Sequence, residues 1–337
     1  MELPIVQAPM AGSQGSALAV AVARAGALGS LPGAMLSADA LQAELEIIRQ
    51  AGVPSLNVNF FCHQPTEAVP AREAAWRAAL QPYYRELGLD PLAIPEAPGR
   101  RPFDEQAADV LERFAPRVVS FHFGLPAASL LARVKSWGAK VLSSATTVDE
   151  ARWLAARGVD AIIAQGAEAG GHRAMFLSAD VSTQVGTLAL VPAIVRAVDV
   201  PVIAAGGIAD ARGVAAAIAL GAAGVQVGTA YLFAHEATTS PLHRAALQSA
   251  SAEHTALTNL LTGRPARGIV NRLMRELGPL SELAPAFPRA ATAVLPLRAK
   301  AESLGSGDFS PLWSGQNVAG CRPASAAEIT RALAAGL

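Results

Sequence analysis

The stretch AIIAQGAEAGGHR, residues 161–173, carries an acid and a histidine in a glycine-rich turn directly after a run of apolar residues. The acid is Glu168 and the histidine is His172. Histidine is the side chain best suited to give or take a proton near neutral pH. Several glycines in the same turn allow the backbone to approach a ligand closely, whereas an ordinary turn needs one. This combination favours a functional site with proton-transfer chemistry over a plain strand-to-helix loop.

Polar residues and glycines end the other apolar runs of the chain in a similar way. The carboxyl ends of parallel strands meet at one edge of a sheet, and the active sites of such folds lie at that edge. The sequence therefore predicts one cleft that hydrogen-bonds a polar, planar ligand. Its candidate residues are Gln7, Ala8, Pro9 and Met10, then Asn59, His122, Ser143, Ser144, Gln165 and His172, and finally Gly206, Gly207, Gln226, Gly228 and Thr229.

The elements that must position these residues repeat one unit: an alanine-rich helical segment, a glycine stop and a short apolar strand. Strands that are apolar nearly throughout are typical of a parallel sheet covered on both faces. Eight of them with intervening helices predict an α/β fold, the (β/α)8 TIM barrel. A doubly wound open sheet is the main competitor, but it usually has fewer strands and an early glycine-rich loop. The predicted strands are Pro4–Ala8, Leu28–Leu31, Ser55–Phe60, Val118–Phe123, Lys140–Ser144, Ala161–Gln165, Pro201–Ala205 and Gly224–Gly228.

Two stretches interrupt the repeat. Residues 62–116 include the proline-rich and charged run PLAIPEAPGRRPFDE, which predicts a helix and an exposed, partly irregular arm. Residues 235–310 follow the eighth strand and are expected to form an inserted, mainly helical cap domain over the barrel mouth. The chain then ends in SAAEITRALAAGL, where Ser325 and Glu328 have the spacing of a capping box. This last segment is expected to be a delayed eighth barrel helix, so that residues 1–234 and 311–337 form the barrel.

Composition narrows the classes of partner. The chain has 337 residues, of which 52% are hydrophobic, and its 27 Lys and Arg balance 27 Asp and Glu. Nucleic-acid and anionic-membrane binding need a basic surplus, so neither partner is expected. No signal peptide or membrane span is evident, which predicts a cytoplasmic globular protein acting on a small molecule. Cys62 and Cys321 are too few for a disulfide scaffold and are expected to be free thiols.

The ends of the seventh and eighth predicted strands favour a phosphate site. Each segment, PVIAAGGIAD at 201–210 and GVQVGTAYL at 224–232, pairs a glycine turn with a helix start. TIM barrels commonly bind a phosphate at this place through backbone N–H groups. Gly206 and Gly207 permit a close approach, and Thr229 adds a hydroxyl donor. No glycine-rich loop ending in Lys-Ser or Lys-Thr is present, which disfavours a nucleoside triphosphatase.

Other candidate groups are less specific. The six histidines form no His-x-x-x-His pair and the cysteines no Cys-x-x-Cys pair, so no catalytic metal is expected. Cys62 has no matched base in the sequence, which favours a buried inert thiol over a nucleophile. His122 fits a hydrogen-bonded core histidine and a pocket donor equally well. Trp313 fits a packing anchor for the returning chain slightly better than a ligand contact.

With these residues placed, the chain resembles the nitronate monooxygenase family, formerly called 2-nitropropane dioxygenases, and most of all its class I bacterial branch. The likeness covers nearly the whole chain, which makes it specific. The resemblance implies the same barrel with a helical cap and a non-covalent FMN cofactor. Its motifs are QAPMAG at 7–12, LNVNFFCH at 56–63, FHFGLP at 121–126, QGAEAGGHR at 165–173, AAGGIAD at 204–210, GVQVGT at 224–229, TGRPAR at 262–267 and LWSGQ at 312–316.

The resemblance also implies roles for individual residues. His172 matches the family's active-site histidine, and His122 matches a second histidine that faces the substrate in class I members. The phosphate would lie on Gly207, Gly228 and Thr229, in agreement with the glycine turns. The remaining matches to flavin contacts are Asn59, Gln165, Gly170, Gln226 and Val227, with Ala8, Pro9 and Met10 lining the ring side.

The implied activity is the FMN-dependent oxidation of alkyl nitronates by O2 to a carbonyl compound and nitrite. A protonated or donating His172 would stabilise the anionic nitronate, with His122 as a second donor, whereas a neutral nitroalkane would need His172 as a base. Residues 286–300, AFPRAATAVLPLRAK, lack the tyrosine-rich stretch and early lysine expected of class I, which argues against an acidic nitronate such as propionate 3-nitronate.

Two other functions fit the same residues. One is an FMN-dependent NAD(P)H:quinone or enoyl-thioester reductase, which rapid flavin bleaching by NADH would reveal. The other is a flavin-binding protein without turnover, in which His172→Ala would change nothing. Under each of these functions the chain is expected to be a monomer or a homodimer.

Overall fold

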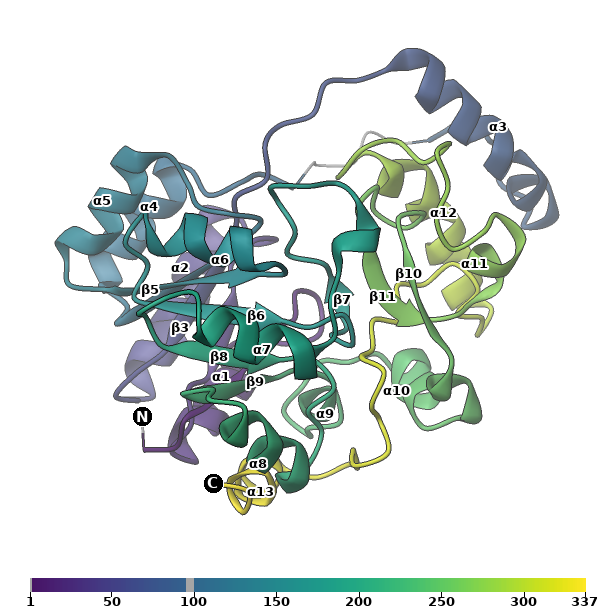
Figure 1. The fold of residues 1–337 in the computed structure, drawn as a ribbon. Helices are drawn as coiled ribbons and strands as arrows, with labels where there is room; N and C mark the ends of the chain where they lie inside the picture. The colour runs from purple at the N-terminus through teal and green to yellow at the C-terminus, as the bar shows by residue number, and fades with distance from the viewer. Residues whose placement is uncertain (1, 95–99) are drawn as a thin grey trace.

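Eight parallel strands form a barrel at the centre of the computed structural model, which describes residues 2–94 and 100–337 (Figure 1). The strands pair in the order β1-β9-β8-β6-β5-β4-β3-β2. A bridge between Val6 and Leu28 joins β1 to the chain entering β2 and closes the barrel. The strands are β1 Ile5–Gln7, β2 Ser30–Pro32, β3 Asn57–Phe61, β4 Val118–His122, β5 Lys140–Ala145, β6 Ala161–Gln165, β8 Val202–Ala205 and β9 Gly224–Val227. All eight predicted strands are present, so the predicted TIM barrel is confirmed.

The barrel strands are apolar because both of their faces are covered. Val58, Val119, Val141 and Ile162 are fully buried between the barrel interior and the surrounding helices. Burying each such side chain contributes about 1.5–3 kcal/mol to folding. The helices of the barrel are α1 Ser16–Arg24, α2 Ala38–Gln50, α4 Glu105–Phe114, α5 Ala128–Ser136, α6 Val148–Ala155, α7 Thr187–Val195, α8 Ala211–Ala219, α9 Thr229–Leu232 and α13 Ala326–Ala334.

Glycines and caps end and begin these helices as the sequence indicates. Gly138, which follows α5, has a φ of +84°, and Gly221, which follows α8, has a φ of +93°. Glycine adopts this left-handed conformation without steric cost. At the start of α13, Ser325 and Glu328 form the predicted reciprocal capping box. Residues close in sequence therefore determine where strands and helices alternate.

Helix α13 returns to the barrel after a long excursion of the chain, residues 233–325, which separates it from α9. It packs between α1 and α8, where the helix that follows the last strand of a TIM barrel is expected (Figure 1). The hydroxyl groups of Tyr231 and Thr330 lie 2.8 Å apart and join α9 to α13. The ring of helices around the barrel is therefore complete, although its last helix follows the excursion.

A second apolar core lies outside the barrel and combines two separate insertions. Trp76 and Tyr84 of α3, Pro70–Glu86, donate to the carbonyls of Ala290 and Ala293 in α12, Ala290–Ser303, at 3.1 and 2.7 Å. Figure 1 shows α3 beside α12 and away from the barrel helices. The other elements of residues 235–310 are α10 Pro241–Leu247, η2 Ala250–Glu253, β10 Thr255–Thr258, β11 Ala266–Ile269 and α11 Arg272–Glu276, and η1 Val181–Thr183 precedes α7.

The sequence did not indicate the small sheet in this region. Strands β10 and β11 pair antiparallel, and β11 also pairs with β7, Gly171–His172, so that the barrel loop bearing His172 joins the sheet of the excursion. The division of the chain at residues 235 and 310 stays a prediction, because α3 from the earlier insertion shares the second core. Residues 95–99 of the predicted irregular arm lie outside the described residues.

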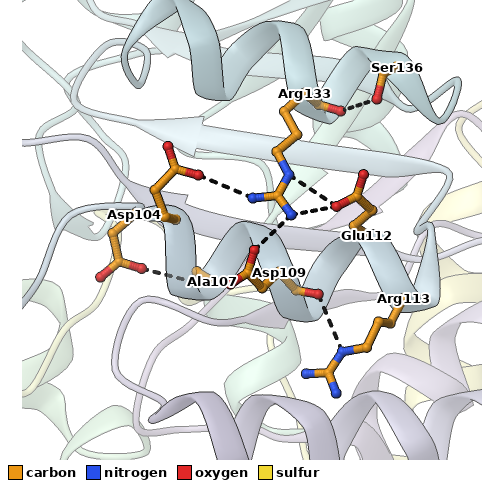
Figure 2. A network of polar contacts seen from close by, with 8 residues as sticks. Asp104, Ala107, Asp109, Glu112, Arg113, Arg133 and Ser136 are labelled. Carbon is orange, nitrogen blue, oxygen red and sulfur yellow. Dashed lines mark hydrogen bonds and ion pairs between the residues drawn. The ribbon is translucent and has the colours of Figure 1, made fainter.

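On the outside of the barrel, one arginine joins two neighbouring helices. Arg133 of α5 forms ion pairs with Glu105 at 3.1 Å and Asp109 at 2.7 Å, and it also pairs with Glu112. The three acids are four and three residues apart on one face of α4, as Figure 2 shows for Asp109 and Glu112. This Arg133 network is a surface feature, since the acidic side chains are at least half exposed.

No helix in the described part of the chain is long and apolar enough to cross a membrane. Both cysteines are free thiols. Cys62 is buried, and its burial raises its pKa well above the usual value. The thiolate, which is the reactive form, is therefore disfavoured there, in agreement with the predicted inert thiol.

Candidate functional site

The carboxyl ends of the barrel strands open into a cavity of about 1330 Å³, counting the part that is open to solvent. Of the predicted site residues, Gln7, Ser143 and Val227 do not line it, and the others do. Gln7 and Ser143 are fully buried inside the protein. The side chain of Val227 is buried in the barrel core instead, because successive residues of a strand face opposite sides. Among the described residues no aspartate or glutamate lines the cavity, whereas Arg100, His122, His172 and His243 do.

His172 lies in β7 at the side of the cavity formed with the second sheet. Its Nε2 is 2.9 Å from the hydroxyl of Thr262, a residue 90 positions further along the chain. That hydroxyl is also 3.4 Å from the carbonyl of Arg264. Burial lowers the pKa of His172 well below the usual value, and the nearby guanidinium groups of Arg100 and Arg264 lower it further. The imidazole is therefore neutral at physiological pH.

His122 ends strand β4, and each of its ring nitrogens has a partner within the protein. Nε2 lies 3.2 Å from the backbone carbonyl of His172, and Nδ1 lies 3.3 Å from the hydroxyl of Ser144. Burial lowers the pKa of His122 to about 3, with smaller contributions from Arg264 and Arg173 in the same direction. This imidazole too is neutral at physiological pH.

Aromatic rings pack around His172. Phe123 packs edge-on against His172 at a centroid distance of 5.9 Å, and Phe287 does so at 5.4 Å. The ring of Trp313 lies 5.6 Å from His172 and reaches the cavity, so this residue is both a packing anchor and part of the cavity wall. Phe123 adopts a φ of +70°, a strained conformation for a phenylalanine. Apolar rings around neutral imidazoles explain why desolvation dominates their pKa values.

The opposite wall of the cavity is made of backbone. Strands β8 and β9 lie side by side; Gly207 is the second residue after β8, and Gly228 is the first after β9. No acceptor in the described part of the chain takes the N–H of either glycine. The hydroxyl oxygen of Thr229 accepts from the N–H of Gly315 at 3.0 Å, which leaves its own hydrogen free to donate. Free donors at adjacent strand ends are what a phosphate site needs, and the phosphate site predicted here stays a prediction.

Two glutamines at the strand ends differ in whether their side-chain amides have hydrogen-bond partners within the protein. The Oε1 atom of Gln226, on β9, is buried without a hydrogen-bond partner in the described structure. A buried amide oxygen in that state is costly, so it indicates a missing N–H donor in the cavity. Gln165, on β6, bonds the backbone of β7 instead: Nε2 donates to the carbonyl of His172 at 3.0 Å, and Oε1 accepts from Ala174 N at 2.8 Å.

Gly170 is required for a reason that the sequence does not reveal. A Cβ atom built there would lie 2.6 Å from both Gly315 N and Ser314 C, well inside van der Waals contact. The residue therefore allows the chain at 314–317 to pass close by, which is a packing requirement within the protein. Asn59 likewise uses its amide nitrogen inside the barrel, on the hydroxyl of Ser120 at 2.9 Å.

Several residues of the site were not identified from the sequence. Arg100 lies in the arm after β3, and Asn317 lies in the returning chain, where it donates to the carbonyl of Gly207 at 2.9 Å. Thr262 stands in the motif TGRPAR, but its type gave no sign of a contact with His172. No group of three or more potential ligand side chains in the described structure could hold a metal ion.

Known proteins resemble this chain over its whole length. A sequence model of the family described as "Nitronate monooxygenase" matches residues 1–336. The nitronate monooxygenase of Pseudomonas aeruginosa is 40% identical over 99% of this chain and 95% of that protein. Among solved structures, nitroalkane oxidase from Streptomyces ansochromogenes superposes with a TM-score of 0.90 at 38% identity, covering 99% of this chain and 95% of that one.

A second solved structure is more distant. FabK from Thermotoga maritima superposes with a TM-score of 0.74 at 27% identity, over 99% of this chain and 92% of that one. Both superpositions therefore cover nearly all of this chain. The chain belongs to the nitronate monooxygenase family, a group of flavin-dependent oxidoreductases.

Proposed function

We propose that the protein binds FMN and oxidises alkyl nitronates with O2 to a carbonyl compound and nitrite. Gly207, Gly228 and Thr229 would hold the phosphate through their free donors. The unpartnered Oε1 of Gln226 would accept from an N–H group of the flavin ring. The donors at the glycines and Thr229 therefore fit the phosphate of the cofactor, and the acceptor of Gln226 fits its ring. Bound flavin would supply the electron-transfer chemistry, which no protein side chain provides.

The charge of the cavity supports an anionic substrate. A nitronate carries one negative charge, and the cavity has the cation Arg100 but no carboxylate among the described lining residues. In a site with low dielectric constant, that imbalance raises the local concentration of anions and stabilises them when bound. The aromatic rings of Phe61 and Trp313 would contact the alkyl part of the substrate.

His172 is suited to act on the substrate in its neutral form. The Thr262 hydroxyl can donate or accept, so it supports either neutral tautomer of His172. With its proton on Nδ1, the ring would donate to an oxygen of the nitronate. With its proton on Nε2, the lone pair of Nδ1 would take the α-proton of a neutral nitroalkane. A permanently charged imidazolium is disfavoured, because burial and neighbouring arginines lower its pKa.

The observation that carries this proposal is the neutral His172, whose hydroxyl partner Thr262 can donate or accept, in a cavity with no carboxylate among its described lining residues. The chain that holds this cavity belongs to the nitronate monooxygenase family. The test is the visible spectrum of the purified protein after anaerobic mixing with propyl-2-nitronate and, separately, with NADH. We expect a flavin spectrum that bleaches with the nitronate alone, and nitrite once air is admitted. Bleaching by NADH alone, without nitronate turnover, would instead assign the protein to the FMN-dependent reductases.

A matched pair of substrates sharpens the experiment. Nitropropane in its neutral form should react far more slowly than preformed nitronate at the same pH, because the neutral carbon acid first needs proton abstraction. Equal rates would show that His172 works chiefly as a base. A spectrum without flavin after reconstitution with FMN would contradict the cofactor assignment itself.

A further inference from the structure

The backbone carbonyl of His172 receives two side-chain hydrogen bonds from the barrel. One comes from Nε2 of His122 at 3.2 Å and the other from Nε2 of Gln165 at 3.0 Å. His122, Ser144 and Gln165 lie on three consecutive neighbours of the sheet, β4, β5 and β6. Strand β7 itself has only two residues and pairs only with β11 in the described structure. The position of His172 over the cavity therefore depends on side chains from the barrel.

The hydrogen bonds of His122 fix its tautomer. A backbone carbonyl can only accept, so Nε2 of His122 must carry the proton that points at His172. Nδ1 then has a lone pair, and the hydroxyl of Ser144, 3.3 Å away, must donate to it. Both ring nitrogens are thus occupied within the protein. A nitrogen in this state has no proton to offer to a ligand unless the contact with His172 breaks.

Gln165 completes the arrangement on the other side of the same residue. Its Oε1 accepts from Ala174 N at 2.8 Å, so one side chain holds the backbone both before and after Arg173. The guanidinium of Arg173 is fully buried and bonds the carbonyls of Gln165 and Gly166, at 2.7 Å each. The end of β6 and strand β7 therefore hold each other in place. Gln165 keeps a second amide hydrogen that is available to a ligand.

We propose that His122 is a positioning residue, which, together with Gln165, clamps the carbonyl of His172 and thereby fixes the place of the His172 ring over the cavity. The inference rests on the proposed function, because it assigns His172 as the group that acts on the nitronate. It differs from the role implied by the family resemblance, in which His122 faces the substrate as a second donor. Misplacing a reacting group by about 1 Å can cost 10²-fold in rate. His122 and Gln165 therefore support catalysis by holding His172 in place, although they do not react with the substrate themselves.

The variant His122→Gln separates the two roles, because the amide of glutamine can place an N–H near the position of Nε2 but cannot exchange a proton as imidazole does. We expect His122→Ala to lower kcat for nitronate about 100-fold, with FMN content unchanged. His122→Gln should recover most of that loss and keep the pH profile of the wild type. Ser144→Ala is the matched control and should have a smaller effect, since it removes only the outer hydrogen bond.

A second measurement does not depend on turnover. In the FMN-loaded protein labelled with ¹⁵N-histidine, long-range ¹H–¹⁵N spectra report which ring nitrogen carries the proton. We expect His122 to show a protonated Nε2 and an unprotonated Nδ1 that do not titrate between about pH 5.5 and 8.5. Ser144→Ala should leave Nε2 protonated but shift the Nδ1 resonance.

Two results would overturn the proposal. One is His122→Gln losing as much activity as His122→Ala together with one limb of the pH profile, which would make His122 a proton-transfer group. The other is a His122 ring that titrates near neutral pH in the loaded protein. Failure of the proposed function gives a different result: the wild type would then not turn over nitronate, while the spectra would still show whether the His122 tautomer is fixed.

Discussion

The Arg133 network lies on the outside of the barrel, and the pair His122 and His172 lies at its carboxyl end. Both join neighbouring elements through polar side chains, but the first consists of exposed ion pairs and the second of buried neutral rings. Arg133 forms ion pairs with three acids, as Figure 2 shows for Asp109 and Glu112, and the acidic side chains are at least half exposed. His122 and His172 are buried, neutral and surrounded by rings and arginines. The first network has more ion pairs than any other place in the described structure, whereas the second has none.

Solvent explains the difference. Water screens the Arg133 network, so adding or removing one of its charges changes little. Burial removes that screening from the histidines, so their protonation is set by desolvation and by which neighbour donates or accepts. The number of polar contacts therefore does not indicate where function lies. A more informative sign of function is a titratable group whose protonation state is fixed by its surroundings in the protein.

The largest effect is expected at His172. Replacing it with alanine should lower kcat/KM for nitronate about 10²–10⁴-fold, because the group that acts on the substrate is lost. FMN content and Tm should stay close to those of the wild type. Because its pKa lies below the usual value for histidine, activity that needs neutral His172 should stay level through neutral pH and fall only in acid. An unchanged rate in His172→Ala would contradict the role of the buried pair.

The buried histidines should also make folding sensitive to acid, in contrast to the surface network. His122 has a pKa of about 3 when folded and His243 one of about 4, against a usual value of 6.5. Such groups contribute their full stability above the unfolded pKa and lose it as the pH falls through the window toward 3 or 4. Urea unfolding at successive pH values should show this loss, at about 1.4 kcal/mol for each unit of pKa shift. His122→Gln should reduce the slope, and an equal slope would contradict the assignment.

Gly170 tests the close packing beside the site. Gly170→Ala should lower Tm and FMN content, because its Cβ would meet backbone atoms at 2.6 Å. Gly171→Ala is the matched control: it has open space but a φ of +71°, so only backbone strain of about 1–2 kcal/mol is expected. If both variants lost FMN equally, the packing contact would not be the cause.

Thr229 should have a smaller effect on cofactor binding. Thr229→Ala should weaken FMN binding by about 1 kcal/mol, or about fivefold in Kd, through one lost hydrogen bond. Thr229→Ser keeps the hydroxyl that accepts from Gly315 and should bind FMN as the wild type does. Fluorescence titration of the apoprotein measures both. Equal affinity in all three proteins would count against the phosphate site.

The smallest effect is expected at Arg133. Arg133→Ala should leave nitronate turnover and FMN binding unchanged and lower Tm only slightly at low salt, because its partners are exposed. The difference from the wild type should vanish at about 1 M NaCl, where the Debye length is about 3 Å. A large loss of activity would show that the outer network is coupled to the buried site.

The barrel could be predicted because its signals are local. The predicted strand Ala161–Gln165 has the observed bounds, and Pro4–Ala8 exceeds the observed Ile5–Gln7 by one residue at each end. Apolar runs, glycine stops and caps act within a few residues of each other, so they can be read from the chain in order. The same is true of the glycine turns after β8 and β9, which the structure places on one wall of the cavity.

The second core and its sheet could not be predicted in this way. Strand β7 is only two residues long, and its partner β11 lies almost a hundred residues further along the chain. Helix α3 belongs to an insertion after β3 but packs on α12, which is more than 200 residues away. Pairings at such distances leave no periodic pattern in the sequence, so a helical cap was the natural expectation.

The sequence by itself determined a (β/α)8 barrel, the edge at which its polar residues gather, and His172 as the leading candidate for chemistry. Only the tertiary structure decided what state those residues are in. It joined His172 to Thr262 and to His122, 90 and 50 residues away, and buried both rings among aromatic side chains. Residue type limits what a group can do, but desolvation and partners distant in the chain set its protonation and direction, and these exist only once the chain has folded.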